Sequence, residues 1–521
     1  MRRNSIFISL LLLTLSSVCK AQDTLYVRYD DRFKANTRMY IASPDSMAFR
    51  QDAVTISKPD GTTQNIKYGT LIPVGQGSLM FTNPGRYLLK PNTYAGTNYT
   101  DANATEGYNF AHSLESEHFA VFWDVRFGSN PAKISIGGST ASAYDVLDVA
   151  ERCWNSYVGE LGFLKEGHST TDKYKIQLYI PYQSEWRADA SGTDGVNGGK
   201  TGIGHFNPWA ATARGGHTIA HEVGHTFQYL VGADLGSSHG WGWGFNGDGW
   251  GDNGWWESCA DWQAYQIFPE RQFTDGEYFE QHLTAHHLNM LHEDWRYACC
   301  YIQDWWCMKR GRDIIGRMWR ETNKPEDPIQ TYKRMNGLTQ EQFNDELMEG
   351  YMRMATWDID GVRDRAKHRI GQHKTYLKVV NASQAIYKAD VEHCIQNYGY
   401  AIMNMTRPAA GTEVKAEFKG LTDAEGFHYV YPERAGWRYA FVALQKDGIR
   451  TYGEVKSDKE GTASIVVPTD CTNLFFVVMG APTQHWPHPW DRNYDASHWT
   501  QNNEQWPYQV QFVNAKPVKI G

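Results

Sequence analysis

The sequence lacks any CxxC pair, any dense run of Lys and Arg, and any internal repeat with a period of about 20 to 50 residues. Because no CxxC pair is present and the number of cysteines after Cys19 is odd, we expect neither a disulfide scaffold nor a thiolate zinc site. Buried free thiols are the preferred interpretation, with a Cys394–Cys471 bond as the alternative. A net charge of −8 without a basic run excludes a nucleic-acid partner, because phosphates require a basic face.

Long apolar segments are also missing, except near the start of the chain. The stretch MRRNSIFISLLLLTLSSVCKAQ carries two arginines, an apolar run over 6–15 and small residues around Ala21. This layout is typical of a secretory signal peptide. The apolar run is too short to span a bilayer. We therefore expect a mature chain from about Gln22, a secreted or periplasmic location and no membrane span. Lipidation at Cys19 is the alternative.

The length of 521 residues suggests about two or three domains behind a leader at 1–21. Short alternating segments and Pro-Asp-Gly turns predict a β domain over 22–105, and KPNTYAGTNYTDANATEG near its end is expected to be a linker. Residues 106–374 combine strands such as HFAVFWDV and KYKIQLYI with amphipathic helices, for example 144–161. Strands with Gly-rich turns predict a β-sandwich over 375–521. The expected fold class is α+β.

One short stretch, HTIAHEVGHTFQYL, combines helical periodicity with metal-binding side chains. His221, Glu222 and His225 form HExxH, and positions i and i+4 share a helix face, so both imidazoles can bind one Zn²⁺ ion. Glu222 is then the expected general base at the open coordination position. A further imidazole from His217 would close that position, so His217 is not expected to be a ligand.

A catalytic zinc needs a third protein ligand. Glu257, in the helical pattern WWESCADWQAYQ, is the predicted ligand. Asp261 follows one helical turn later and is expected to accept the ring N–H of a ligand histidine, which fixes the tautomer of that ring. The alternative interpretation is that both residues are solvated acids beside a packed tryptophan helix.

The combination of HEVGH and ESCAD resembles the gluzincin metallopeptidases, which carry HExxH and a downstream ExxxD. With SEHFAVFW and VVMGAPTQHWPHP, the chain is also similar to an uncharacterised family of secreted bacterial proteins described as metallopeptidases. The first resemblance implies a gluzincin-like catalytic domain, the ligands and roles given above, and an oxyanion-binding tyrosine on a helix beyond the glutamate. Tyr297 stands at a similar place. The other candidates for this role are Tyr301, His286, His287 and His292.

A long insertion between His225 and Glu257 departs from the thermolysin-like pattern. It contains five tryptophans and eight glycines. The tryptophan rings could form a glycan-binding subsite or could simply pack over the active-site helix. A calcium site there is a weaker interpretation, because the candidate ligands lack EF-hand spacing; they are Asn246, Asp248, Asp252 and Asn253. Upstream, GGKT lacks the first glycine of a phosphate loop. TGIGHFNPW resembles the gluzincin edge strand that pairs with extended substrate, with His205 as a hydrogen-bonded structural residue.

These patterns predict a secreted zinc metallopeptidase that hydrolyses peptide bonds in a protein, peptide or glycoprotein substrate, with Glu222 as general base. Two alternatives stay open. One is a metal-dependent enzyme that acts on glycans or glycopeptides, and the other is a non-catalytic glycan-binding protein with a structural metal.

Overall fold

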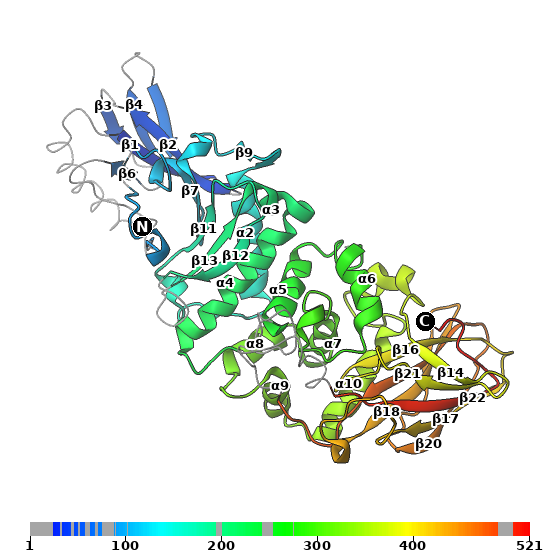
Figure 1. Cartoon of the computed structure of the whole chain (residues 1–521). Coiled ribbons are helices and arrows are strands. Elements are labelled where there is room, and N and C mark those ends of the chain that lie inside the picture. The colour runs from blue at the N-terminus through cyan, green and yellow to red at the C-terminus, as the bar shows by residue number, and fades with distance from the viewer. Residues whose placement is uncertain are drawn as a thin grey trace. The chain divides into compact units, whose positions relative to one another are not determined.

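The computed structural model describes residues 88–520 except 89, 100, 102, 194–200, 242–253, 275 and 488–503, and for residues 24–74 the backbone of the strands. The chain forms two compact units, residues 1–237 and 238–521. Both contain helices and sheets, so the α+β class is confirmed (Figure 1). The expected signal peptide, Cys19, the GGKT run and most of the tryptophan-rich insertion lie outside the described residues. The division into three domains stays a prediction.

The first unit is built on one mixed sheet. Its strand order is β12 (Ala188–Gly192), β13 (Gly202–Phe206), β11 (Ile176–Ile180), β8 (Phe119–Trp123), β7 (Ser113–Glu115), β2 (Lys34–Ala42), β1 (Thr24–Asp31) and β6 (Leu71–Val74). Strands β8, β11 and β13 run parallel, and β12 pairs antiparallel with β13 at the edge. Smaller sheets are formed by β3 (Ser46–Phe49), β4 (Ala53–Ser57) and β5 (Thr63–Lys67), and by β9 (Ile134–Ile136) and β10 (Ser139–Ala141).

The central strands β8, β11 and β13 are buried along their whole length, because both faces of the sheet are covered. Helices α2 (Ala143–Gly159) and α4 (His217–Leu235) pack against these strands, as Figure 1 shows. An aromatic cluster covers other side chains of the same strands; it contains Tyr99, Tyr108, Phe110, Phe122 and Tyr179. Tyr99 comes from the stretch expected to be a linker, and its hydroxyl bonds that of Tyr179 at 2.9 Å. That stretch is therefore packed on the sheet.

Helix α4 is fixed to its neighbours by close contacts. The Tyr157 hydroxyl of α2 donates to the Ala220 carbonyl of α4 at 3.0 Å, and the Tyr157 and Phe227 rings pack edge to face. On the sheet side, a Cβ at Gly202 would lie 2.5 Å from Thr226 Cβ, so only glycine allows β13 to approach α4 this closely. Gly216 precedes the helix at φ 97°, a left-handed conformation that suits glycine and turns the chain into α4.

The second unit begins with helices and ends in a sandwich. Its helices are α5 (Gly254–Ile267), α6 (Gly276–Ala285), α7 (Tyr301–Arg310), α8 (Ile314–Glu321), α9 (Pro328–Asn336), α10 (Gln340–Met354) and α11 (Arg363–Ala366). Thr339 and Gln342 form a capping box at the start of α10. Helix α7 begins only at Tyr301, because the residues before it form a 3-10 turn and a loop.

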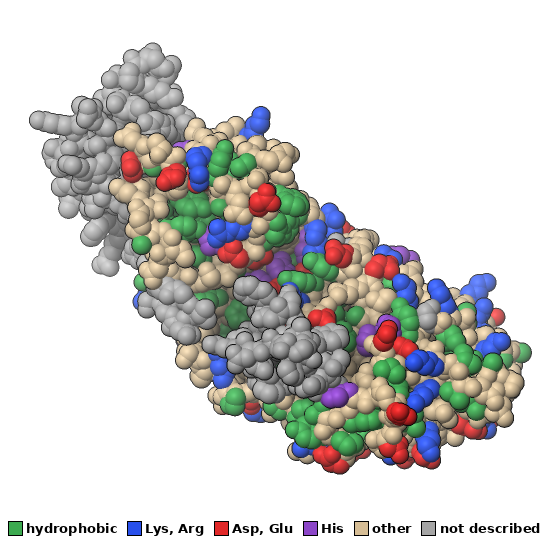
Figure 2. Space-filling model, in the orientation of Figure 1, with side chains coloured by type: hydrophobic (Ala, Val, Ile, Leu, Met, Phe, Trp, Pro, Cys, Tyr) green, Lys and Arg blue, Asp and Glu red, His purple; other side chains and the backbone are tan. Residues whose placement is uncertain are grey.

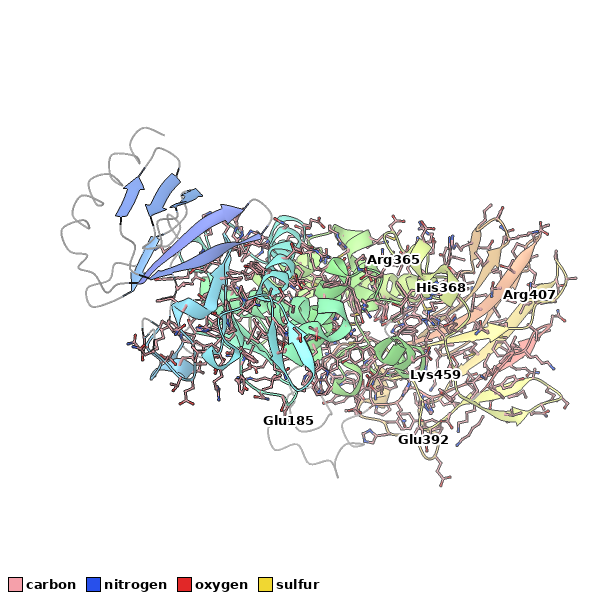
Figure 3. All side chains as sticks on the ribbon, turned by 90° about the horizontal axis from the view of Figure 1, so that it is seen from above. Glu185, Arg365, His368, Glu392, Arg407 and Lys459 are labelled. Atoms are coloured by element: carbon pink, nitrogen blue, oxygen red, sulfur yellow. The ribbon has the colours of Figure 1, made fainter. Side chains whose placement is uncertain are left out.

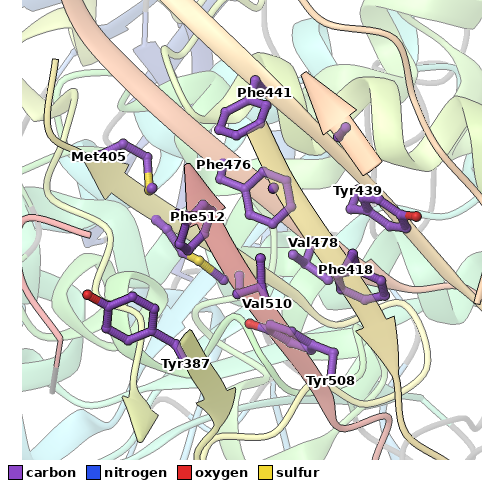
Figure 4. Packing of buried hydrophobic residues seen from close by; sticks show 14 of the residues in the cluster. Tyr387, Met405, Phe418, Tyr439, Phe441, Phe476, Val478, Tyr508, Val510 and Phe512 are labelled. Carbon is purple, nitrogen blue, oxygen red and sulfur yellow. The ribbon is translucent and has the colours of Figure 1, made fainter. Parts of the chain in front are cut away.

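Two antiparallel sheets share one core in the C-terminal part, which is the expected β-sandwich. One sheet contains β14 (Leu377–Asn381), β15 (Ile386–Ala389), β22 (Tyr508–Val513), β17 (Glu413–Gly420) and β20 (Glu460–Val466). The other contains β16 (Tyr400–Met405), β21 (Cys471–Gly480), β18 (Trp437–Gln445) and β19 (Arg450–Tyr452). Figure 4 shows the aromatic rings between them; the Phe476 and Phe512 centroids are 5.3 Å apart.

Burial along the sandwich strands follows their surroundings. Strand β17 alternates between buried and less buried residues, as expected for a sheet with one solvated face. Strand β18 is buried over almost all its length, because α10 covers its second face. The alternating pattern EVKAEF thus corresponds to a strand buried on one face, and the apolar run WRYAFVAL corresponds to a strand buried on both faces.

The cysteines bear out the expectation of free thiols. All seven described cysteines are free, including Cys394 and Cys471, so the alternative disulfide is wrong. On the face that Figure 2 shows, basic and acidic side chains are interspersed. Among the described helices, none has the length and apolarity needed to cross a membrane.

Two buried histidines give this unit an expected acid sensitivity. His282 Nδ1–H donates to the Ala298 carbonyl at 2.9 Å, and His286 Nδ1–H donates to the Tyr400 carbonyl at 2.7 Å. Burial lowers the pKa of His282 to about 3 and that of His286 to about 4. The folded protein therefore keeps both rings neutral, while the unfolded chain takes up two protons below the ordinary histidine pKa of about 6.5.

We expect the free energy of unfolding to fall by about 3 kcal/mol from these two groups as the pH drops from about 7.5 to about 5.5. Urea unfolding at both pH values measures it. In His286→Gln the pH-dependent loss should shrink by about 1.4 kcal/mol, the share of one histidine, whereas the exposed His368→Asn control should leave it unchanged. An equal pH dependence in all three proteins would contradict the assignment.

Candidate metal centre

Helix α4 brings the two histidines of HExxH together. His221 is buried and His225 is half-buried, and their Nε2 atoms lie 3.1 Å apart. Two nitrogens bound tetrahedrally to one zinc, at bond lengths of about 2.0–2.1 Å, would lie roughly 3.3 Å apart. Glu222, the residue between them in the motif, is only 5% exposed. The spacing of the imidazoles thus fits two ligands of one small ion.

Gln228 fixes the His225 ring. His225 Nδ1–H donates to Gln228 Oε1 at 2.8 Å, which leaves Nε2 without its proton and available as a ligand. The sequence motifs predict such a role only for Asp261 and do not indicate Gln228. The available signal was its spacing, since residues three apart on a helix are neighbours.

Glu257 and Asp261 lie on α5. The start of this helix is held by Glu293, whose Oε1 accepts the Gly254 backbone N–H at 2.7 Å. Along α5, Gln303 of α7 donates to the Ser258 hydroxyl at 2.9 Å. Glu257 is half-buried in the first turn and Asp261 is fully buried one turn later. The predicted helix and the predicted one-turn spacing of the two acids are confirmed.

His221, His225 and Glu257 form a group that can hold a metal ion. Each offers one ligand atom, and the three atoms lie within 4.8 Å of one another. Two imidazoles and a carboxylate are the donor set of one class of catalytic zinc site, with a fourth position left for water. His217 is not part of this group, as expected.

A family model described as "Family of unknown function (DUF6055)" matches residues 81–519. The chain belongs to the DUF6055 family. No curated protein and no solved structure matches it. The match covers both units, so the helix with HEVGH and the helix with ESCAD fall within the same family region.

In this DUF6055 protein, the charge of Glu257 acts on the hydroxyl of Tyr297. Burial, and secondly the Glu257 carboxylate, raise the pKa of the Tyr297 hydroxyl, so it stays protonated and can donate. Its ring stacks on Tyr278 with centroids 5.2 Å apart. Contrary to the expectation of a helical position, Tyr297 lies in the turn before α7.

Three of the alternative oxyanion donors have other partners in the DUF6055 fold. The Tyr301 hydroxyl donates to the Gln272 carbonyl at 2.7 Å, and His286 bonds the Tyr400 carbonyl. His292 is fully buried, and its Nδ1 accepts the Asp294 backbone N–H at 3.1 Å. These contacts leave Tyr297 as the candidate with the clearest link to a ligand residue.

The expectation for TGIGHFNPW needs a correction. Strand β13, which this sequence forms, pairs with β11 on one side and β12 on the other, so β12 is the edge strand. His205 is a hydrogen-bonded structural residue as predicted: its Nδ1 bonds Asp189 Oδ1 at 2.7 Å and its Nε2 bonds the Tyr94 hydroxyl. The sequence could not distinguish a strand next to the edge from the edge itself.

The described ends of the tryptophan-rich insertion pack inward. Trp241 and Trp255 are 2% and 1% exposed, and the Trp241 ring lies 4.9 Å from that of Trp319. These two residues therefore pack among the helices of the second unit, and packing over the active-site helix stays a prediction. The remaining tryptophans of the insertion between them, and the calcium candidates, lie outside the described residues.

Removing the Gln228 amide should weaken metal binding. We expect Gln228→Ala to lower zinc affinity by about 10–100-fold, because His225 loses the acceptor that fixes its tautomer. Competition with a fluorescent zinc chelator measures the affinity. Gln281→Ala, at a half-buried glutamine of helix α6, serves as control and should match wild type. Equal affinity in both variants would refute the role of Gln228.

Proposed function

We propose that this protein is a secreted zinc metallopeptidase of the gluzincin type that hydrolyses peptide bonds. The observation that carries the proposal is the convergence of ligand atoms from His221, His225 and Glu257 within 4.8 Å. A His₂Glu donor set is found in zinc peptidases. The HExxH and ExxxD motifs on two helices support the same assignment.

Within this proposal each residue has one task. His221, His225 and Glu257 hold the ion, and Gln228 orients His225. A zinc ion supplies Lewis acidity toward a carbonyl oxygen and makes water acidic near neutral pH. Glu222 takes the proton from the attacking water and passes it to the leaving amine.

Tyr297 and Asp261 complete the proposed site. The Tyr297 hydroxyl, kept protonated by burial and by Glu257, donates to the oxyanion that develops on the substrate carbonyl. Asp261, buried on α5, is proposed to accept the ring N–H of the second ligand histidine, His221, since Gln228 already serves His225.

The edge strand β12 supports a peptide substrate. Among the described strands it pairs only with β13, and it packs against α4, the helix that carries HExxH (Figure 1). An extended peptide that adds to such an edge gains main-chain hydrogen bonds over several residues. A substrate held there lies along the helix of the proposed ligands, which favours proteins or peptides as substrates.

One observation favours a glycopeptide substrate as the second candidate. Trp186 and Trp209, close to the start of β12, are 47% and 50% exposed, and their rings pack edge to face at 5.4 Å. Exposed indoles are surfaces on which sugar rings stack. A glycan attached near the scissile bond would find these rings beside the proposed peptide strand.

The proposed function is tested on the purified full-length protein. We expect about one zinc per chain by elemental analysis, and cleavage products by mass spectrometry when a proteome-derived peptide mixture or mucin-type glycoproteins are added. A zinc chelator should stop cleavage and added zinc should restore it. Bound zinc without cleavage of any peptide or glycoprotein would point to a structural metal and overturn the proposal.

A further inference from the structure

A separate pocket of about 610 Å³ lies in the second unit. It opens between the segment 370–375, which joins the helices to the sandwich, and the ends of strands β16 and β21. Its volume falls in the range of about 300–1,000 Å³ typical of small-molecule sites. None of its lining residues belongs to the proposed metal centre.

The pocket carries more positive than negative charge. Lys374, Arg407 and Lys519 line it, against one acid, Glu280. Glu280 already faces Lys374 Nζ at 3.8 Å. Within the described part of the chain, neither Arg407 nor Lys519 has a carboxylate within ion-pair distance; Arg407 Nη1 donates only to the Cys471 carbonyl, at 2.8 Å. Two cations thus remain for a bound anion (Arg407 is labelled in Figure 3).

Neutral polar groups also line the same pocket. His373 is 4% exposed, and in the described structure neither ring nitrogen has a hydrogen-bond partner. The amides of Asn404 and Asn473 border one point: a Cβ built on Gly371 would lie 3.4 Å from Asn404 Oδ1 and 3.7 Å from Asn473 Nδ2. A buried polar group without a partner is costly, so a ligand hydroxyl that reaches the His373 ring would be favourable, and the amides of Asn404 and Asn473 offer further polar partners.

We propose that this pocket binds a small hydroxylated anion, whose carboxylate or phosphate pairs with Arg407 and Lys519 and whose hydroxyl groups bond Asn404 and Asn473. Arginine suits this task because its planar fork can bond two oxygens of one anionic group. The binding is independent of the zinc site and does not rest on the proposed peptidase function.

Isothermal titration of the full-length protein tests the proposal with three probes: glucuronate, glucose 6-phosphate and glucose. We expect saturable binding of at least one anionic probe and about tenfold weaker or no binding of glucose. Preference for glucuronate assigns a carboxylate ligand, and preference for glucose 6-phosphate assigns a phosphate ligand. Chelation of zinc should leave the affinity unchanged.

Arg407→Gln and Lys519→Gln should each weaken binding about tenfold or more, since hydrogen bonds to charged groups contribute about that factor. Lys459→Gln, at an exposed lysine elsewhere in the sandwich (Figure 3), is the matched control and should bind as wild type. Unfolding temperatures show that the variants are folded. Absence of binding by both anions, equal binding of glucose, or unchanged affinity in Arg407→Gln would overturn the proposal.

Discussion

Glu222→Gln should reduce peptide cleavage by about 10²–10⁴-fold while zinc stays bound. Glutamine keeps the size of the side chain on α4 but cannot take the proton of the attacking water. The proposed metal ligands His221, His225 and Glu257 are unchanged, so the ion should remain at wild-type stoichiometry. The measurement is the initial rate on whichever peptide the mixture experiment identifies, with zinc content determined on the same sample.

The control for this variant is Glu166→Gln, at an exposed glutamate of the same unit. It should cleave at the wild-type rate. Rates of Glu222→Gln within a few-fold of wild type would remove Glu222 from the mechanism. Loss of zinc in Glu222→Gln would instead show that the carboxylate supports the metal site, and the proposed division of tasks would be wrong.

Much of the site follows from local sequence rules. The spacing in HEVGH and the one-turn spacing in ESCAD both describe positions on a helix, and helix geometry is the same wherever the helix lies. The structure confirms both helices and brings His221, His225 and Glu257 into one ligand group. Tyr297 was placed less well, because no local pattern marks the end of the helical turn before α7.

The strands of the sandwich were also predictable, since alternation and Gly-rich turns are local features. The order of strands is not. TGIGHFNPW reads equally well as an edge strand or as its neighbour, because the partner β12 is determined by pairing across the chain. The stretch around Tyr99 is rich in polar residues, which predicts a linker. The packing of its Tyr94 and Tyr99 on the sheet depends on tertiary contacts that the local sequence does not show.

The pattern KYKIQLYI illustrates a further limit. Its alternation suggests one polar face, yet β11 is buried on both faces, and Lys175 just before it is fully buried. Lys175 Nζ donates to Glu115 Oε2 at 3.0 Å and to the Ser116 carbonyl at 2.6 Å. Sequence periodicity cannot reveal this ion pair, because Glu115 belongs to β7 and Lys175 precedes β11, far apart in the chain.

Lys175→Met should destabilise the first unit by about 3–5 kcal/mol, since it leaves the Glu115 carboxylate buried without its cation. For a unit of this size the loss lowers the Tm by roughly 10 °C. Calorimetry that resolves the two units measures it. Lys309→Met is the control: its exposed pair with Glu349 should cost less than about 1 kcal/mol.

The double variant Lys175→Met with Glu115→Leu distinguishes a charge effect from a packing effect. Replacing both members of a buried ion pair by apolar side chains of similar size is often close to neutral, because the cost of desolvating two charges disappears. We expect the double variant to recover most of the stability lost in Lys175→Met. If it is as unstable as the single variant, the role of Lys175 is to fill space beside β11, and the buried charge of Glu115 is not what the lysine compensates.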